Sequence, residues 1–500
     1  MQSAQTTGFR FRDFAPYLTL RTVLYAGIAA GAAAIAYITS RYGFPAGAAF
    51  SLAPLALYGV FYMIKNPYWA YVGVVAVNYF VMGVSTRYVP GLPGGVVIDI
   101  LLGFSVLMLL IRSCHTNVGW IRGVNGLSIA ALVWTVYCIL EFFNPLAVAQ
   151  GWATSIRGIA FYFLAVAVLT PIFFGRYRDM KLILYLWSVF TLMAVLKAFI
   201  QSRFGFDTYE KIWLYQGGGM TTHIIYSGVR YFSFYTDAAN FGSGMGLAMV
   251  VFSIASLYFK KFKMKAYFMT VALAAAYGMV ISGTRGALAV PFAGYALFLL
   301  ISKQKKIILL GGTALLAAFI FLNYTDIGQG NRHVRRMRSA FNSEDPSLNV
   351  RLKNQRVLAD YLADKPFGAG IGMGGGKAKV YAPNAYLSQI PTDSWFVLIW
   401  TETGIVGLIL HLAILFYVLV YACYLVLFRL KNKQLRGLIC ALTSGIFGMM
   451  VSSYGNEVLG QFPSGIIIYM CQAFIFLSPV YDRELERTPA GKDYRYGVQG

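Results

Sequence analysis

The sequence predicts an all-α, polytopic integral membrane protein with about 12–14 transmembrane helices and one large outer loop. Two observations predict this class. Across 500 residues, 58% are hydrophobic and only 12% are charged, whereas soluble domains carry about 25% charged residues. The apolar residues also come in runs of about 16 to 25, long enough to cross a bilayer as helices. The alternating strands of roughly ten residues that build an outer-membrane barrel do not occur.

Each apolar run defines one candidate span. The runs lie near 22–39, 46–64, 68–86, 96–111, 124–143, 158–174, 181–200, 238–258, 265–282, 286–302, 305–323, 395–428, 437–454 and 464–480. The fourth is short, and the ninth and tenth nearly touch, so the expected number is twelve to fourteen. The run at 395–428 is long enough to contain a kink.

The runs divide the chain into five expected regions. They are an inner N-terminal segment (1–21), a helix bundle (22–323), an outer loop with an amphipathic helix (324–394), C-terminal spans (395–480) and an inner tail (481–500). The first span has no clear cleavage site before it, so we expect a retained anchor and not a signal peptide. The five scattered cysteines fit neither a disulfide framework nor a zinc spacing.

The distribution of basic residues predicts the orientation of the chain, because cytoplasmic loops are enriched in Lys and Arg. With fourteen spans and an inner N-terminus, the inner segments hold 24 of the 42 Lys and Arg, and the short outer segments hold seven. Ten more lie in 324–394, which the alternation places outside. That loop is longer than about 60 residues, a length at which the charge rule loses force. Both termini are therefore expected inside and the loop outside.

The stretch NRHVRRMRSAFNSEDPSLNVRLKNQR, residues 331–356, gathers seven basic residues in this loop. One interpretation is a solvated surface against anionic lipid headgroups, at about 1 kcal/mol per basic residue. The other is a phosphate or diphosphate site, because guanidinium groups bind phosphate oxygens in a bidentate manner. The loop holds ten basic and six acidic residues, a net charge of only +4. The positions of the arginines, and not the net charge of the loop, therefore have to distinguish a phosphate site from a lipid-facing surface.

Three neighbouring stretches favour the phosphate site. ISGTRGAL, residues 281–288, is a short outer turn between two spans with Arg285 at its tip. KPFGAGIGMGGGK, residues 365–377, lacks the Gly and Ser or Thr positions of a nucleotide-binding loop. Its glycines are expected to make tight turns or to let the backbone approach a ligand. PTDSWFVLIWTETGIVGL, residues 391–408, places Asp393 just before a long apolar run and Glu402 inside it.

Together these stretches resemble the O-antigen ligase and O-antigen polymerase superfamily of bacterial inner-membrane glycan transferases. RYFSFYTDAANFGSGMG at 230–246 is similar to the family's Phe-x-x-Pro/Asp-x-x-Asn segment, which leads into a helix. SGTRGA at 282–287 matches its Ser-x-Ser/Thr-Arg-Gly/Ala turn. NVRLKNQRVLADYLADKPFGAGIG at 349–372 matches an amphipathic helix that ends in a Pro-x-Gly-x-Gly turn. TDSWFVLIWTETGIVGL matches the segment that opens the next span, so the resemblance covers roughly residues 200–455.

One departure from the family pattern affects the expected chemistry. Many relatives carry His-Asn nine residues before the Glu that corresponds to Glu402. Here Asp393 and Ser394 stand at those positions, and none of the four histidines falls in the motif. Either Asp393 takes over the role of the histidine, or that role is not proton abstraction.

The resemblance implies a reaction at the periplasmic face of the bacterial inner membrane. A glycan carried on undecaprenyl diphosphate is transferred to a hydroxyl of a lipid-A core or another glycan, and undecaprenyl diphosphate leaves. Members of this family are usually metal-independent and invert the anomeric centre. The expected partners are therefore the donor, the acceptor and membrane lipids, with no cofactor, metal or nucleic acid. Arginines suit this reaction because fixed guanidinium groups stabilise the charge of a leaving diphosphate.

The arginines are expected to bind the diphosphate. Arg285 and Arg351 are the first candidates, and Arg356 is expected to share a helix face with Arg351. Weaker candidates for the same role are Arg335, Arg336 and Arg338.

The remaining candidates are polar residues near the expected reaction plane. Asp393 orients or deprotonates the acceptor hydroxyl, and its alternative role is to cap the helix that begins at Trp395. Glu402 is a further binding candidate, although a buried contact that fixes helix packing is the preferred interpretation. Asp237 and Asn240 either line the same cavity or cap the helix that follows them.

Three functions remain open at this point. A ligase moves a finished chain onto a terminal acceptor, and a polymerase uses another lipid-linked repeat as the acceptor. These motifs do not separate the two, because both need the same leaving-group site; a ligase is narrowly favoured. A transporter or flippase of lipid-linked sugar would show matching halves with broken spans, and no matching halves occur.

Overall fold

The computed structural model of the chain describes residues 20–89, 91–225, 228–341 and 346–487. Apart from one pair of two-residue strands, these residues form helices and connecting turns, which confirms the predicted all-α class. Among them, twelve helices are long and apolar enough to cross a membrane. Two shorter apolar helices cover Arg285–Ile301 and Ile308–Tyr324. The predicted range of twelve to fourteen spans agrees with this result.

The chain forms two compact units, residues 1–70 and 71–500. In the first unit, α1 (Leu20–Tyr42) and α2 (Phe44–Lys65) are joined at Gly43, whose φ of 85° lies in the region that favours glycine. Most large apolar side chains of both helices are exposed. A bilayer would cover such surfaces.

The second unit contains the remaining helices, and α3 enters it at Tyr71. Its long elements are α3 (Pro67–Arg87), α4 (Gly94–Ser113), α5 (Gly126–Leu140), α6 (Ala149–Ile156), α7 (Tyr162–Phe173), α8 (Tyr177–Phe204), α11 (Ala238–Tyr258), α12 (Phe262–Ile281), α13 (Ala289–Ile301), α14 (Lys305–Tyr324), α18 (Trp395–Tyr424), α19 (Lys433–Ser452) and α20 (Ser464–Arg487). A π-helical turn, η4 (Arg157–Phe161), joins α6 to α7, and a second one, η8 (Leu425–Arg429), ends α18.

Further elements connect these helices. They are η2 (Trp120–Gly123), η3 (Glu141–Phe143), α9 (Thr208–Gln216), α10 (Met220–His223), β1 (Ile224–Ile225), β2 (Gly228–Val229), η5 (Arg285–Leu288), α15 (Arg332–Arg338), η6 (Ser339–Phe341), α16 (Pro346–Leu362), α17 (Gly375–Tyr381) and η7 (Tyr386–Gln389). The antiparallel pair β1–β2 aligns Ile224 with Val229.

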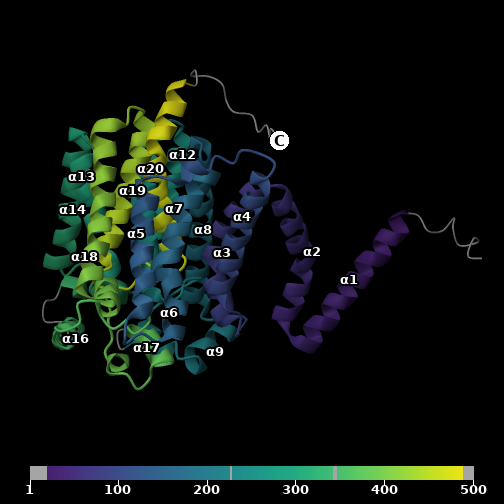
Figure 1. Ribbon diagram of the computed structural model, residues 1–500, viewed down its shortest axis with the longest axis horizontal. Helices are drawn as coiled ribbons and strands as arrows, with labels where there is room; N and C mark the ends of the chain where they lie inside the picture. Colours follow the sequence, from purple (N-terminus) through teal and green to yellow (C-terminus); the bar gives the residue numbers. More distant parts are fainter. Residues whose placement is uncertain (1–19, 90, 226–227, 342–345, 488–500) are drawn as a thin grey trace, which may run out of the picture. The chain divides into compact units, whose positions relative to one another are not determined.

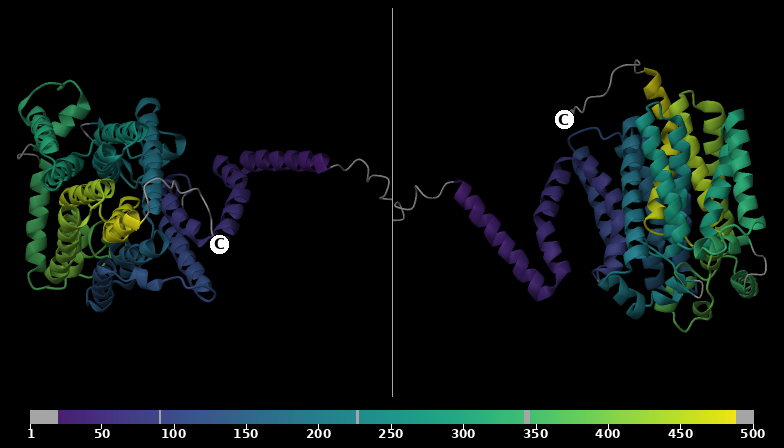
Figure 2. Two further views of the ribbon diagram at one scale, coloured as in Figure 1. Left: turned by 90° about the horizontal axis from the view of Figure 1, so that it is seen from above. Right: turned by 180° about the vertical axis from the view of Figure 1, so that it is seen from behind.

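The core of the second unit is built by α11, α19 and α20, most of whose residues are buried. Seen end-on, the yellow helix α20 lies among the other helices of this unit (Figure 2). Small residues let the backbones approach closely, as is typical of membrane helices. An added Cβ at Gly294 of α13, for example, would lie 2.9 Å from the Ser444 carbonyl oxygen of α19.

The helix α18 is interrupted at Gly404, whose φ of 66° and ψ of −171° are not helical. The glycine-rich run before α17 packs into this break. The Ala369 N–H donates to the Thr401 carbonyl oxygen at 2.9 Å, and the Gly370 N–H donates to that of Glu402 at 3.0 Å. The kink expected in the span at 395–428 is therefore present, and neighbouring backbone satisfies the carbonyl groups that it frees.

Contacts between turns define the two ends of the second unit. At one end, Arg87 at the end of α3 donates from Nη1 to the Ser233 carbonyl oxygen at 2.7 Å. At the other end, Tyr481 Oη donates to the Phe174 carbonyl oxygen at 2.6 Å. We call the first end the site end. The helices α9, α16 and α17 lie there (Figure 1).

Candidate functional site

The loop between α19 and α20, residues 453–463, is the point at which the predicted segments meet. The Trp395 N–H at the start of α18 donates to the Ser453 carbonyl oxygen at 3.0 Å. Ser452, the last residue of α19, donates from Oγ to the Gly286 carbonyl oxygen at 2.9 Å. The turn that carries Arg285 and the segment that carries Asp393 are thus fixed to the same loop.

Two arginines flank the turn before Arg285. Arg230 donates from Nη2 to Thr284 Oγ1 at 2.8 Å, and Arg336 donates from Nε to the Gly283 carbonyl oxygen. An added Cβ at Gly283 would lie 3.4 Å from Arg230 Cγ and 3.3 Å from Arg336 Nε, so both side chains pack on this glycine. Arg230 Nε is buried without a hydrogen-bond partner among the described residues. One donor of this guanidinium therefore has no protein acceptor there.

Arg351 and Arg285 lie within electrostatic range of Arg230. Burial lowers the pKa of Arg230, the Asp237 carboxylate raises it, and the charges of Arg285 and Arg351 lower it again. Arg351 Nη1 lies 3.5 Å from the position of an added Cβ at Gly455, so this guanidinium lies against the loop 453–463. Like charges this close disfavour one another. A bound anion would relieve that repulsion.

The other basic candidates lie elsewhere. Arg335 is exposed and donates to the Gln329 carbonyl oxygen at 3.3 Å, and Arg338 donates to the Ile327 carbonyl oxygen at 2.6 Å. Arg356 is exposed on α16. The expectation that Arg356 shares a face with Arg351 is wrong, because five residues turn an α-helix by about 140° beyond a full turn.

Asp237 and Asn240 both fix the start of α11. Asp237 is its N-cap, and Oδ1 accepts the N–H groups of Ala239 at 2.7 Å and Asn240 at 2.9 Å. The Asn240 side chain is buried; Nδ2 donates to the Phe462 carbonyl oxygen at 2.6 Å, and Oδ1 accepts from Ser464 Oγ at 2.6 Å. The alternatives are that these residues line the cavity or cap the following helix. Asp237 is the cap, and its carboxylate lies within electrostatic range of Arg230. Asn240 instead links α11 to the loop 453–463.

Asp393 is exposed and has a φ of 52°, which is uncommon for a residue with a side chain. The N-cap of α18 is Ser394, so the alternative role of Asp393 as that cap is wrong. Strained backbone of this kind costs about 1–3 kcal/mol and clusters at functional sites. Asp393 lies directly before the N-cap of α18, at the site end.

Glu457 is a third carboxylate in the same region. Its Oε1 accepts a hydrogen bond from Thr392 Oγ1. Burial raises the pKa of Glu457 above its usual range, the bond from Thr392 lowers it, and the charges of Asp393 and Asp237 raise it again. Asp237 therefore lies within electrostatic range of both Arg230 and Glu457 and links the arginines to the carboxylates of the candidate site.

The glycine-rich run covers the carboxylate side of this site. An added Cβ at Gly375, at the start of α17, would lie 3.6 Å from Glu457 Oε1. The Gly374 N–H donates to Glu402 Oε1 at 3.3 Å, whereas Glu402 Oε2 is buried without a partner among the described residues. Lys377, two residues into α17, is accessible to solvent, yet burial lowers the pKa of its amine while Glu402 raises it. The glycines thus let backbone approach two carboxylates.

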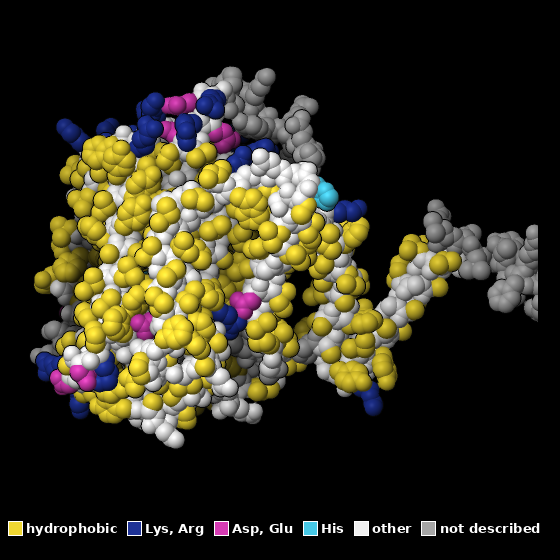
Figure 3. All heavy atoms as spheres, viewed as in Figure 1, with side chains coloured by type: hydrophobic (Ala, Val, Ile, Leu, Met, Phe, Trp, Pro, Cys, Tyr) yellow, Lys and Arg dark blue, Asp and Glu magenta, His cyan; other side chains and the backbone are white. Residues whose placement is uncertain are grey.

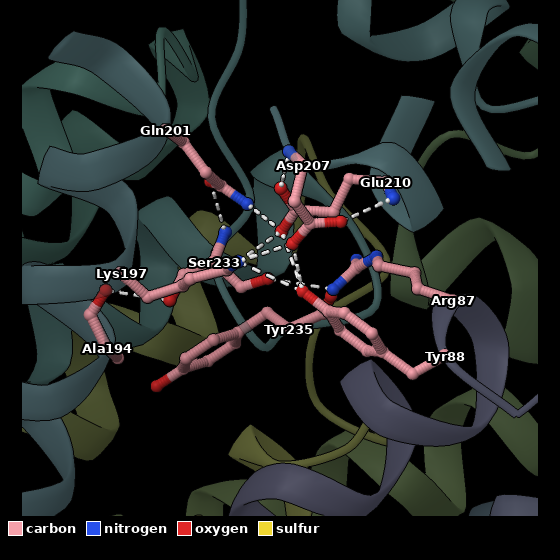
Figure 4. A network of polar contacts seen from close by, with 9 residues as sticks. All are labelled: Arg87, Tyr88, Ala194, Lys197, Gln201, Asp207, Glu210, Ser233 and Tyr235. Atoms are coloured by element: carbon pink, nitrogen blue, oxygen red, sulfur yellow. Dashed lines mark hydrogen bonds and ion pairs between the residues drawn. The ribbon is translucent and has the colours of Figure 1, made fainter. Parts of the chain in front are cut away.

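A polar network holds the segment that leads from β2 to α11 (Figure 4). Arg87 binds the Ser233 carbonyl oxygen, as described above. Lys197 Nζ lies 2.9 Å from Asp207 Oδ2 and 3.0 Å from Glu210 Oε1. The Ser233 N–H donates to Gln201 Oε1 at 3.0 Å, and Gln201 Nε2 donates to Glu210 Oε1 at 2.7 Å. The network ties α3, α8 and α9 to one segment and so positions the start of α11.

Residues 269–412 match the sequence model of a family described as O-antigen ligase. This stretch runs from α12 to the first half of α18 and contains the turn with Arg285, the helix α16 and the break at Gly404. This part of the chain is therefore similar to an O-antigen ligase domain. Members of this family are glycosyltransferase-like ligases or polymerases. No curated protein matches the chain.

The O-antigen ligase match covers only part of the site. Arg285, Arg336, Arg351 and Asp393 lie inside it, whereas the carboxylate of Glu457 comes from the loop 453–463, beyond its end. The candidate site therefore also includes a residue outside the matched stretch.

Sequence reasoning missed three residues that the fold brings to this site, and two of them carried a signal. Arg230 is the first residue of the segment quoted above for its resemblance to the family. Glu457 is the only acidic residue between Glu402 and Asp482, in a short turn between two apolar runs. Lys377 gave no signal beyond its place at the end of the glycine-rich run.

Proposed function

We propose that the chain transfers a glycan from undecaprenyl diphosphate to an acceptor hydroxyl, as an O-antigen ligase does. One observation carries the proposal: Arg285 and Arg351 lie within electrostatic range of Arg230, and Asp237 lies within range of both Arg230 and Glu457. Arginines suit a leaving diphosphate, and carboxylates suit an attacking hydroxyl. A glycosyl transfer of this kind needs both groups in one site.

The arginines act on the leaving group. The bond between the anomeric carbon and the phosphate oxygen breaks, and its electron pair leaves with the diphosphate. Guanidinium groups that are already in place stabilise this charge without reorganising. Arg285 and Arg351 hold the diphosphate, and the geometry adds Arg230 and Arg336, which flank the turn before Arg285.

The carboxylates act on the acceptor. The acceptor oxygen forms the new bond to the anomeric carbon, and its proton passes to a carboxylate. Asp393 accepts this proton or orients the hydroxyl, in the place where relatives carry histidine. Glu457 is the second candidate base, because burial raises its pKa toward the working pH. General bases of this kind contribute about 10²–10⁴-fold to a rate.

The site end is proposed to face the periplasm. On the face of the second unit in Figure 3, Lys and Arg side chains gather at the end opposite α16 and α17. Basic residues favour the cytoplasmic side. The proposed location is therefore the bacterial inner membrane, with the acceptor and the glycan on the outer face.

Deletion of the gene tests the function in cells. Surface glycans separated on a gel should show unligated long chains, which is the ligase outcome. Products with a single repeat would point to a polymerase instead. Unchanged surface glycans would contradict both.

A further inference from the structure

Outside the arginine and carboxylate site, a second charged cluster lies in the spans themselves. Asp99 of α4 forms an ion pair with Arg157 at the start of the π-helical turn η4, and Tyr162 Oη donates to Asp99 Oδ1 at 2.6 Å. The Asp99 and Arg157 side chains are 31% and 30% exposed. Charged residues inside spans are costly and functional by default. The pair is used neither by the proposed reaction nor by the network in Figure 4.

The cluster lies below the site end of the bundle. Asp99 is five residues past the start of α4, and Arg157 is eight past the start of α6. At about 1.5 Å rise per residue, these positions are roughly 8 and 12 Å along their helices. Both residues lie inside helices that are long and apolar enough to cross a membrane.

Arg157 keeps donors that the protein does not use. Among the described residues, only its Nη1 has a hydrogen-bond acceptor, Asp99 Oδ2, and a guanidinium has five N–H donors. The neighbouring Gly95 leaves space beside it, since an added Cβ there would lie 3.9 Å from Nη1, Nη2 and Tyr162 Oη. The π-helical turn that presents Arg157 is a feature often found at functional sites.

Charge connects the cluster to the site. Lys377 of α17 lies within electrostatic range of both Arg157 and Glu457, and Tyr381 of α17 lies within range of Arg157. The helix α17 packs on α6, where an added Cβ at Gly151 would lie 3.6 Å from Tyr381 Cβ. Through its charge, Lys377 therefore connects Arg157 in the spans to the carboxylate of Glu457 in the candidate site.

We propose that Asp99, Arg157 and Tyr162 form an entry site for the diphosphate of a lipid donor that arrives from the membrane. Asp99 holds Arg157 while the site is empty, and the incoming phosphate oxygens replace the carboxylate as its partner. Lys377 is the next basic group on the way to the arginines around Arg285. The inference rests on the proposed function, because it takes the lipid diphosphate as donor.

Binding to the full-length chain in phosphatidylcholine nanodiscs tests the site, with undecaprenyl diphosphate as the probe. Arg157→Gln should weaken binding at least tenfold. Asp99→Asn should bind as tightly as the wild type or more tightly, because Arg157 then has no competing carboxylate. Arg203→Gln is the matched control, since it removes an exposed arginine near the site end of α8. It should bind as the wild type does.

The double variant Asp99→Asn/Arg157→Gln distinguishes a role of the ion pair in binding the lipid diphosphate from a role in packing the helices. It leaves no unpaired charge, so it should melt at the temperature of the wild type and still bind tenfold more weakly. If the ion pair only holds α4 in place, the double variant should bind the probe as tightly as the wild type does. That result would overturn the proposed entry site. Inorganic diphosphate, which reaches the arginines from water, should bind all variants equally.

Two further outcomes are decisive. Competition by phosphatidylglycerol at the same concentration as the probe would overturn the assignment to a lipid diphosphate and leave a site for ordinary anionic lipids. A wild-type chain that binds no undecaprenyl diphosphate would overturn the proposed function as well. Equal binding by Arg157→Gln and the wild type would overturn the entry site alone.

Discussion

At the scale of single residues, the arginines around the turn 282–285 differ in what they contact. Arg230 and Arg336 pack on Gly283, whereas Arg335 and Arg338 bind backbone carbonyl groups of the preceding loop, residues 325–331. The run of basic residues at 331–338 is thus divided by its helix into one side chain at the site and others away from it. An interpretation based only on the net charge of the loop would not distinguish these arginines from one another.

The first prediction compares these arginines. Arg230→Ala and Arg285→Ala should each lower transfer by roughly 10²–10³-fold, as for other preorganised groups that stabilise charge. Lys should restore little, because it lacks the bidentate guanidinium. Arg335→Ala, the control, should cost much less, and Arg336→Ala should cost more than this control. Transfer in membranes at equal expression measures the effect. Wild-type transfer by Arg285→Ala would reduce the cluster to lipid anchoring.

The second prediction concerns Asp393. Because Ser394, and not Asp393, stands at the N-cap of α18, Asp393→Asn should leave the helix and the expression level intact. If the carboxylate takes the acceptor proton, this variant should be nearly inactive, and Asp393→His should recover part of the activity because histidine accepts a proton. Transfer in membranes is measured for both. Full activity of Asp393→Asn would remove Asp393 from the role of base.

The third prediction uses the pKa of Glu457. Its folded-state pKa is raised by burial, so the folded chain binds this proton more tightly than the unfolded chain does. The stabilisation is present at low pH and is lost as pH rises through the folded pKa. The melting temperature of the wild type should therefore fall from about pH 5 to pH 8 more than that of Glu457→Gln.

The same substitution separates the role of Glu457 in the reaction from its role in stability. If Glu457 is the base, Glu457→Gln should lose transfer at every pH. If Asp393 is the base, the variant should keep transfer and lose only the pH dependence of melting. Equal melting curves for both proteins would contradict the raised pKa of Glu457.

At the scale of elements, the break in α18 joins the spans to the glycine-rich run. Gly404 and Gly368 approach so closely that neither has space for a side chain, and both have positive φ. The break also brings Glu402 to the Gly374 N–H, which supports its preferred interpretation as a packing contact. This arrangement holds α17, and with it Lys377, over the carboxylates.

The fourth prediction tests this joint. Gly404→Ala should destabilise the chain by more than about 2 kcal/mol, because alanine is strained at this backbone conformation and its Cβ would meet the Pro366 carbonyl group. Gly103→Ala in α4 is the control; an added Cβ there meets nothing within 4 Å. Thermal melting of the purified proteins in detergent compares them. A Gly404→Ala protein as stable as the control would contradict the described break.

At the scale of the whole molecule, the opposed ends of the second unit support the proposed orientation. Basic residues gather at one end (Figure 3), and the arginine and carboxylate site lies at the other. A transferase that uses a lipid-linked glycan needs this polarity, because its donor and acceptor meet on one side of the membrane.

The fifth prediction labels the two ends. Lys353→Cys, exposed on α16, should react with an impermeant maleimide in intact spheroplasts. The native Cys114, exposed in the turn after α4 at the other end, should react only after lysis. The label on each position is read after digestion. The reverse pattern would invert the orientation.

The sequence by itself determined the membrane class, the number and approximate bounds of the spans, and the resemblance to O-antigen ligases. These properties depend on local features: the length of an apolar run and short motifs around Arg285 and Asp393. It also indicated the kink in the span at 395–428, because that run is too long for one straight crossing.

Only the tertiary structure decided which polar side chains share the site. Arg336 meets Gly283 across 53 residues, and Thr392 meets Glu457 across 65. Helix periodicity by itself separates Arg356 from Arg351, whereas the structure was needed to show that Ser394, and not Asp393, stands at the N-cap of α18. The physical reason is that local pattern fixes where helices begin and which faces are apolar, whereas contacts between turns depend on how the helices pack.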